Sequence, residues 1–213
     1  MIQVGKTRGS EVEVRLSASS TRRIEEAIRQ KYATVSVTPE GHFRYPTGRA
    51  GLERLGYALE IIERLPPGAI SSYCGVGNPF TLGFLGEGET LLDIGCGGGA
   101  DTFLAAMKVG PKGGAVGIDI TWEMLVRAKE NLRGTSLGKV SFYLASAEEL
   151  PFADESFDVV ISNGVFNLIP DKAKALAEAF RVLKKGGRLL MADQSLTGCP
   201  PDDPEERIQS WFR

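Results

Sequence analysis

From Thr90 onward, short apolar runs alternate with segments whose apolar residues recur at helical spacing. The runs predict buried strands, because a parallel sheet hides both of its faces from water. Strands are predicted at residues 91–94, 115–118, 140–144, 157–162 and 188–192, and helices at residues 101–108, 122–132 and 172–184. This alternation is typical of βαβ units. It predicts an α/β fold with a doubly wound, mostly parallel sheet and helices on both faces.

Upstream of these strands the pattern predicts helices. Ser19 and Ser20 can cap a helix that carries Ile24 and Ile28 on its apolar face. A second helix is predicted over residues 52–62 by its apolar spacing, with the Pro-Pro-Gly segment that follows as its end. We therefore divide the chain into a helical N-terminal extension, residues 1–75, and a second domain, residues 76–213.

Composition and charge are those of an ordinary globular protein. Of 213 residues, 42% are hydrophobic and 24% are charged, and the net charge of -2 gives no electrostatic reason to expect nucleic acid or a membrane as partner. No apolar run suits a bilayer span, and the first residues lack the apolar stretch of a signal peptide. Cys74, Cys96 and Cys199 are too scattered for a disulfide framework. We expect a reduced, cytoplasmic protein without a metal site.

The segment that says most about function runs from Leu91 to Ala100 and reads LLDIGCGGGA. A buried strand here leads into a glycine-rich turn and then a helix, and glycine lets the backbone approach a ligand closely. Gly95, Gly97 and Ala100 also fit the dinucleotide fingerprint G-x-G-x-x-G/A. The glycines alone are therefore also compatible with a NAD-linked oxidoreductase.

Two acidic residues narrow this choice. Asp119 ends the second strand, where a carboxylate can accept hydrogen bonds from ribose hydroxyls in either kind of protein. Asp93 stands two residues before the first glycine, where it is poorly placed beside a pyrophosphate. A carboxylate there suits a ligand with a cationic amino-acid end, because opposite charges attract. S-adenosylmethionine carries an ammonium and a sulfonium, so we expect it as the cofactor.

Three segments together resemble the class I S-adenosylmethionine-dependent methyltransferases, which have a Rossmann-like fold. They are DIGCGGG at residues 93–99, AEELPFADESFDVV at residues 147–160 and RVLKKGGRL at residues 181–189. Other segments, among them GNP at residues 77–79 and SNGVFNLIPDK at residues 162–172, are similar to arsenite methyltransferases. The resemblance implies an enzyme that transfers a methyl group to a small molecule.

The resemblance also implies which residues bind the cofactor. The glycine-rich turn would contact the methionyl part, Asp119 the ribose and Ile120 the adenine. Ser146 stands where many relatives carry an acid, and its neutral hydroxyl accepts a weaker hydrogen bond from the adenine amino group. The full implied set is Gly75, Asp93, Gly95, Cys96, Gly97, Gly99, Asp101, Asp119, Ile120, Ser146, Ala147, Glu148, Asn163 and Gly164.

The resemblance to arsenite methyltransferases is incomplete. That family holds arsenic with cysteine thiolates, which suit a soft metalloid. Val76 and Gly164 stand where two of those cysteines are expected. A metalloid methyltransferase using Cys74 and Cys199 is therefore an alternative only if the fold brings those thiols together. A protein that binds S-adenosylmethionine without catalysis is a second alternative.

The catalytic residues and the acceptor are left open by the sequence. His42 is the only histidine, and we expect it on the surface rather than as a base. Several aromatic residues of the extension either form a lid over the sulfonium and acceptor or pack the helices onto the second domain. They are Tyr32, Phe43, Tyr45, Tyr57 and Tyr73.

The residues after the fifth predicted strand indicate how the sheet ends. Methyltransferases of this class usually continue past the fifth strand with a helix and an antiparallel hairpin, for which the residues after Asp193 leave no room. We therefore expect the hairpin to be missing and the fifth strand to be an edge that needs a cover. A helix starting at Asp203 and Pro204, with Trp211 and Phe212 on its apolar face, or a second chain in a homodimer would cover it.

Overall fold

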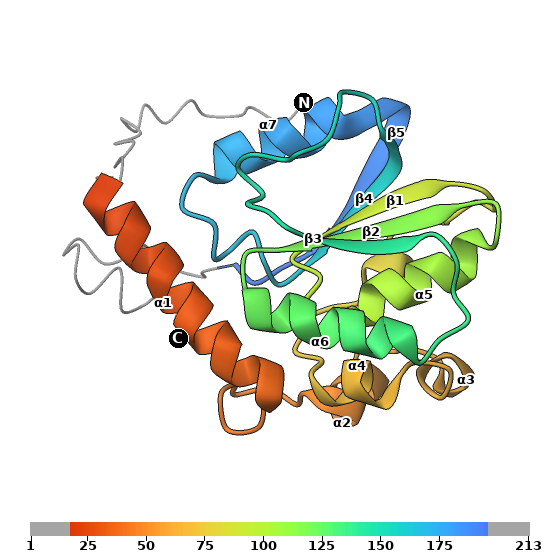
Figure 1. Ribbon diagram of the computed structural model, residues 1–213, viewed down its shortest axis with the longest axis horizontal. Coiled ribbons are helices and arrows are strands. Elements are labelled where there is room, and N and C mark those ends of the chain that lie inside the picture. The colour runs from red at the N-terminus through yellow and green to blue at the C-terminus, as the bar shows by residue number, and fades with distance from the viewer. Residues whose placement is uncertain (1–17, 196–213) are drawn as a thin grey trace, which may run out of the picture.

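The computed structural model describes residues 18–195, which form a five-stranded parallel sheet in the order β3-β2-β1-β4-β5 (Figure 1). This order confirms the predicted α/β, Rossmann-like fold. The strands are β1 Thr90–Ile94, β2 Gly114–Asp119, β3 Val140–Leu144, β4 Phe157–Asn163 and β5 Leu183–Ala192. The helices are α1 Ala18–Val37, α2 Gly48–Arg54, α3 Leu59–Ile62, α4 Pro67–Ser71, α5 Ala100–Val109, α6 Trp122–Arg133 and α7 Lys172–Val182, with a 3₁₀ turn, η1, at Pro79–Thr81.

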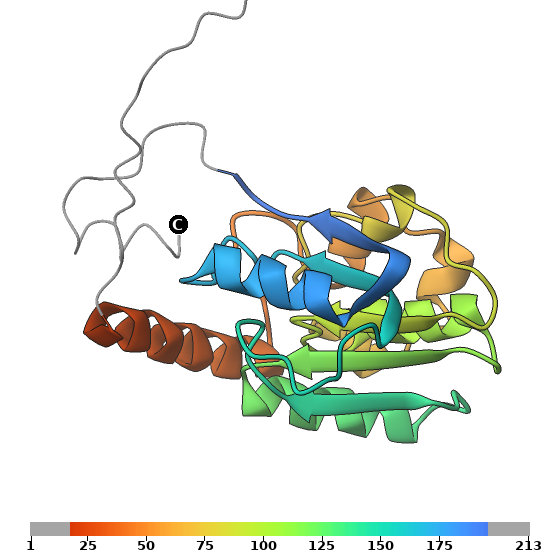
Figure 2. The same ribbon diagram turned by 90° about the horizontal axis from the view of Figure 1, so that it is seen from above.

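Helices cover both faces of the sheet, with α5 and α6 on one side and α7 on the other (Figures 1 and 2). Successive residues of a strand point to opposite faces, so β1 contributes to two cores. Leu91 is buried in the same cluster as Ala105 of α5. Leu92, the next residue, is buried in the same cluster as Ala179 of α7. The sequence of β1 is apolar on both sides because both sides are covered.

The chain changes direction within the sheet between β1 and β4. From β1 it moves through α5 to β2, whereas from β4 it moves through α7 to β5 on the opposite side. In a sheet of this kind, the crevice beyond the carboxyl ends of the strands at such a switch point is the usual place for a ligand. Helix α1 lies across this end of the sheet, toward which the strand arrows point in Figure 2.

The segment between α2 and α4 shares its core with the sheet. Leu52, Ile62 and Tyr73 are buried in one cluster with Phe103 of α5 and Leu125 of α6. This cluster runs across residue 75, where the sequence suggested a boundary. The division of the chain into residues 1–75 and 76–213 therefore stays a prediction.

Three predicted helix boundaries are wrong. Ser19 and Ser20, which were predicted to cap the first helix, lie inside α1, because α1 already includes Ala18. The helix predicted over residues 52–62 is split into α2 and α3, because Gly56 adopts a φ of 78°, which a right-handed helix does not allow. The helix predicted to end at Lys184 ends at Val182 instead. Leu183 already has an extended backbone and pairs with Phe157 in β4. Lys184 and Lys185 therefore belong to β5 and not to the helix.

Within residues 18–195, β3 and β5 are the two edge strands of the sheet. The predicted C-terminal helix at Asp203 and Pro204 lies outside the described residues, and so does Cys199. The expectations of a missing hairpin and of a covered edge stay predictions. None of the helices in this range is long and apolar enough to cross a membrane.

Candidate cofactor-binding site

A pocket opens beyond the carboxyl ends of the strands, beneath α1. It spans about 820 Å³ of space, part of which is open to solvent. Its wall includes nine of the residues implied for cofactor binding, namely Gly95, Gly97, Asp119, Ile120, Ser146, Ala147, Glu148, Asn163 and Gly164. The other five, Gly75, Asp93, Cys96, Gly99 and Asp101, are not part of the pocket lining. The assignment of all fourteen to cofactor contacts stays a prediction.

The glycine-rich turn brings bare backbone to the pocket. Gly95 and Gly97 have φ values of 75° and 51°, a region that side chains rarely adopt. The amides of Gly95 and Cys96 both donate to the carbonyl of Ile118, at 2.8 and 2.9 Å, which ties the turn to the end of β2. A Cβ atom at Gly95 would collide with Val165, so the close approach itself requires glycine.

Asp119 joins the turn to the start of α6. Its Oδ2 accepts a hydrogen bond from the Gly97 amide at 2.9 Å, and its Oδ1 accepts one from the Thr121 amide at 2.8 Å. Burial raises the pKa of this carboxyl even though these donors act to lower it. The carboxyl is part of the pocket lining, where a ligand can approach it.

Asp93 and Asp101 form a second, deeper pair of acids. Asp93 is 2% exposed and accepts a hydrogen bond from Thr102 Oγ1 at 2.6 Å. Asp101 accepts from the Tyr57 hydroxyl at 2.7 Å and from Asn163 Nδ2 at 2.9 Å. Burial, and for Asp93 also the negative charge of Asp101, raises the pKa of both carboxyls. Ionisation of these acids is therefore costly unless a cation comes near.

Asn163 holds the turn at residues 75–77 against the end of β4. Its Oδ1 accepts from the amides of Val76 and Gly77, at 2.9 and 3.1 Å. Its Nδ2 donates to the Gly77 carbonyl at 2.8 Å and to Asp101. A single side chain at the pocket wall thus links the N-terminal segment, β4 and the start of α5.

The aromatic residues of the extension divide into two groups. Tyr57 and Tyr73 are buried and meet edge to face at 5.8 Å, and the Tyr73 hydroxyl lies 3.1 Å from the Gly77 carbonyl oxygen, so they pack and position the turn. Tyr32 instead lines the pocket, and its ring meets that of Phe43, which meets that of Tyr45, in tilted contacts. Tyr57 and Tyr73 are thus candidates for the packing role, and Tyr32 is a candidate for the lid role.

The sequence missed one whole wall of the pocket. Glu25, Ile28 and Tyr32 of α1 line it, although only Tyr32 belongs to the aromatic set singled out above. The spacing of the three residues shows that they share one helix face, but not what that face meets. Further lining residues that sequence reasoning missed are Ile94, Ile118, Thr121, Met124, Ala145, Val165, Leu168, Ile169 and Pro170. His42 is exposed, as expected.

Cys74 also lies in the pocket wall. Burial and the negative charge of Asp119 raise the pKa of its thiol to about 12, against the opposing effect of Lys31. The thiol is therefore protonated at neutral pH. Val76 and Gly164, which stand where arsenite methyltransferases carry cysteines, are neighbours, because a Cβ at Gly164 would come within 3.2 Å of Val76.

Known proteins with similar sequences are methyltransferases. The methyltransferase domain family matches residues 85–213, more than half of the chain. The arsenite methyltransferase of Halobacterium salinarum is 43% identical over 74% of this chain and 40% of its own length. The ubiquinone/menaquinone biosynthesis C-methyltransferase of Pasteurella multocida is 41% identical over 59% of this chain and 46% of its own.

Solved structures give the same result. An arsenic(III) S-adenosylmethionine methyltransferase from Chlamydomonas reinhardtii is 36% identical with a TM-score of 0.53, over 70% of this chain and 50% of its own. A SAM-dependent methyltransferase from Aquifex aeolicus is 26% identical with a TM-score of 0.52, over 74% of this chain and 79% of its own. The chain spans less than half the length of the two curated relatives above. It belongs to the class I S-adenosylmethionine-dependent methyltransferases.

Proposed function

We propose that this chain binds S-adenosylmethionine in the pocket beneath α1 and transfers its methyl group to a small molecule. The observation that carries this proposal is a group of three carboxylates, the half-buried Asp119 in the pocket wall and the buried Asp93 and Asp101 behind it. The described part of that wall contains no lysine or arginine. Such an environment favours a cationic ligand over a pyrophosphate, which supports the methyl donor over NAD.

Methyl transfer requires little from the protein beyond binding of the donor and alignment of the acceptor. S-adenosylmethionine supplies a methyl group on a positively charged sulfur, which is a built-in leaving group. The chain's part is to hold the donor, to align the acceptor and to exclude water. Asn163 fixes the turn at residues 75–77 beside the pocket, and α1 covers the opening from the other side.

A transfer assay tests this function. The protein would be incubated with methyl-labelled S-adenosylmethionine and separate acceptor pools of thiols, phenols, amines and arsenite, and the labelled products would be identified by mass spectrometry. We expect label in at least one pool, and its loss in Asp119→Ala. If the protein binds the donor and labels none of these pools, the transfer proposal is wrong and the non-catalytic alternative is favoured.

A second candidate function is methylation of a metalloid, because relatives with this activity in their names cover most of the chain. Cys74 in the pocket wall is the one observation that favours it. A soft metalloid prefers several sulfur ligands, and Cys74 is the only cysteine that lines the described pocket. Arsenite methylation that is abolished in both Cys74→Ser and Cys199→Ser would support this candidate. Arsenite turnover unaffected by either change would exclude the predicted thiol pair.

A further inference from the structure

The pocket has a wall that the cofactor motifs do not account for. Glu25, Ile28 and Tyr32 of α1 face the ends of β1, β2 and β4 from across the pocket. They lie on one helix face, since residues three, four and seven positions apart point the same way. The motif residues occupy the sheet side, so α1 is free to contact a second molecule beside the donor.

Tyr32 is held at one end of this wall. Its ring centroid lies 6.3 Å from that of Phe43, which lies 5.1 Å from that of Tyr45. The Tyr45 hydroxyl donates to the Cys74 carbonyl at 3.0 Å, and Lys31 Nζ lies 4.8 Å from the centre of the Phe43 ring. These tilted ring contacts and the hydrogen bond to Cys74 support Tyr32 at the end of the pocket where Cys74 forms the wall.

That end is next to the residues expected at the methionyl part of the donor. Cys74 directly precedes the turn that Asn163 holds, and Asn163 and Gly164 line the same pocket. Burial raises the pKa of Tyr32 well above its ordinary value, and the negative charges of Asp119 and Asp193 act in the same direction. The hydroxyl therefore keeps its proton and acts as a hydrogen-bond donor, not as a base.

The surroundings of Tyr32 define what kind of molecule fits there. Ile28 and Leu168 are apolar lining residues, and the Cys74 thiol is protonated. The charged residues of the lining are all acidic: Glu25, Asp119 and Glu148. These carboxylates would repel an anion, an effect that Lys31 opposes from outside the lining, and a cation would compete for the place of the donor's own charge. An uncharged partner avoids both costs.

We propose that Ile28, Tyr32 and Cys74 form the methyl-acceptor subsite, that the Tyr32 hydroxyl donates a hydrogen bond to the acceptor, and that the acceptor is an uncharged molecule with an apolar body. This inference rests on the proposed function. In the transfer, a lone pair of the acceptor forms the bond to the methyl carbon while the carbon–sulfur bond breaks. The electron pair of that bond stays on sulfur, and any proton that the acceptor loses passes to water.

Three probes of similar shape and different charge test the subsite, namely benzyl alcohol, benzoate and benzylamine, which is protonated at pH 7. Their binding to protein saturated with S-adenosylhomocysteine would be measured by ligand-observed NMR. The variant is Tyr32→Phe, and its matched control is Tyr143→Phe, because Tyr143 is 48% exposed on the edge strand β3. The affinity for S-adenosylhomocysteine is measured in parallel by calorimetry.

We expect benzyl alcohol to bind at least tenfold more tightly than benzoate or benzylamine. Tyr32→Phe should weaken benzyl alcohol about fivefold, the effect of one lost hydrogen bond between neutral groups, with a less than twofold change for S-adenosylhomocysteine. Tyr143→Phe should change neither. Equal binding of a charged probe, or unchanged benzyl alcohol binding in Tyr32→Phe, would overturn the subsite. Failure of the unaltered protein to bind S-adenosylhomocysteine would instead overturn the proposed function.

Discussion

Three carboxylates, two of them buried and the third half-buried, dominate the chemistry of this protein at the scale of single residues. Asp93, Asp101 and Asp119 each accept hydrogen bonds, yet burial raises the pKa of all three. A cationic ligand would favour their ionised forms. The same acids that suit the proposed donor thus reduce the stability of the free protein at neutral pH.

Replacing Asp93 by asparagine tests whether this carboxyl lowers the stability of the free protein. A carboxyl whose pKa is higher in the folded state than in the unfolded state stabilises the folded state at low pH. This stabilisation is lost as the pH rises from the pKa of the unfolded state through the pKa of the folded state. Asp93→Asn removes this dependence and keeps an oxygen for the Thr102 hydroxyl. We therefore expect the melting temperature at pH 8 to rise.

Thermal unfolding at pH 5 and pH 8 measures the effect, with Glu60→Gln on α3 as an exposed control that should change neither value. The gain should be larger at pH 8 than at pH 5. An Asp93→Asn protein that melts below the unaltered protein at pH 8 would show that the buried charge is not the costly element.

The affinity for S-adenosylmethionine should depend on pH with a definite sign. Because the acids bind protons more tightly without a ligand, a cation that requires their ionised forms must displace protons. We expect affinity to increase as pH rises from 5 to 7.5 and protons to be released on binding. Calorimetry at pH 6 in phosphate and in a buffer with a large ionisation enthalpy detects the release. Proton uptake, or tighter binding at pH 5, would contradict this expectation.

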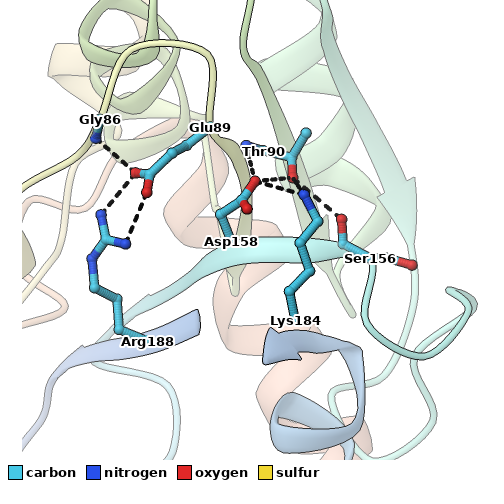
Figure 3. A network of polar contacts seen from close by, with 7 residues as sticks. All are labelled: Gly86, Glu89, Thr90, Ser156, Asp158, Lys184 and Arg188. Atoms are coloured by element: carbon cyan, nitrogen blue, oxygen red, sulfur yellow. Dashed lines mark hydrogen bonds and ion pairs between the residues drawn. The ribbon is translucent and has the colours of Figure 1, made fainter. Parts of the chain in front are cut away.

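At the scale of the elements, polar side chains lock the ends of the strands that lie opposite the pocket. Figure 3 shows Lys184 of β5 pointing at Asp158 of β4, whose Oδ2 also accepts from the amide and hydroxyl of Thr90 in β1. Arg188 of β5 pairs with Glu89, just before β1, at 2.7 Å. These contacts join three strands where the register of β5 shifts against β4.

Asp158→Asn should weaken this junction. The bond from Lys184 Nζ, at 2.8 Å, would lose its charge, so we expect a loss of about 1 kcal/mol in the free energy of unfolding at pH 7, measured with urea. The pKa of Asp158 is lowered to about 2, so its contribution is present above pH 4 and lost as pH falls toward 2. Asp154→Asn, whose side chain is 74% exposed in an ion pair, should cost less than about 0.5 kcal/mol. Equal effects of the two changes would argue against a structural role for the junction.

The break between α2 and α3 depends on one backbone conformation. A Cβ at Gly56 would meet nothing within 4 Å, so an alanine there is opposed only by the φ of 78°. Gly56→Ala should therefore lower the free energy of unfolding by about 1 kcal/mol. Gly138→Ala is the matched control, because it also has open space and no left-handed φ. Urea unfolding of both variants compares them, and an unchanged Gly56→Ala protein would mean that the two helices can merge.

At the scale of the whole molecule, the sequence predicted the sheet better than its cover. Every strand was anticipated, because buried parallel strands are short apolar runs whatever surrounds them. The break at Gly56 was missed because the apolar spacing continues through it, and only the backbone conformation reveals the turn. The end of α7 was missed because Lys184 and Lys185 are typical of a helix end, whereas the pairing of Lys184 with Asp158 needs the folded sheet.

The candidate site was predictable only where a motif marks it. The glycine-rich turn and Asp119 carry local signals, and the fold brings them to one pocket. The α1 wall carries none, because the apolar face of Ile28 reads the same whether it covers a core or a ligand. The hydrogen bonds from Val76 and Gly77 to Asn163 join residues far apart in the chain, so no local pattern predicts them.

The central claim is that this pocket binds S-adenosylmethionine, and calorimetric titration tests it most directly. S-adenosylmethionine, S-adenosylhomocysteine and NADH would be titrated into the unaltered protein and into Asp119→Ala at pH 7.5. We expect the first two to bind, NADH not to bind, and the variant to bind the first two at least tenfold more weakly. No binding of either adenosyl compound by well-folded protein, or equal binding by Asp119→Ala, would contradict it.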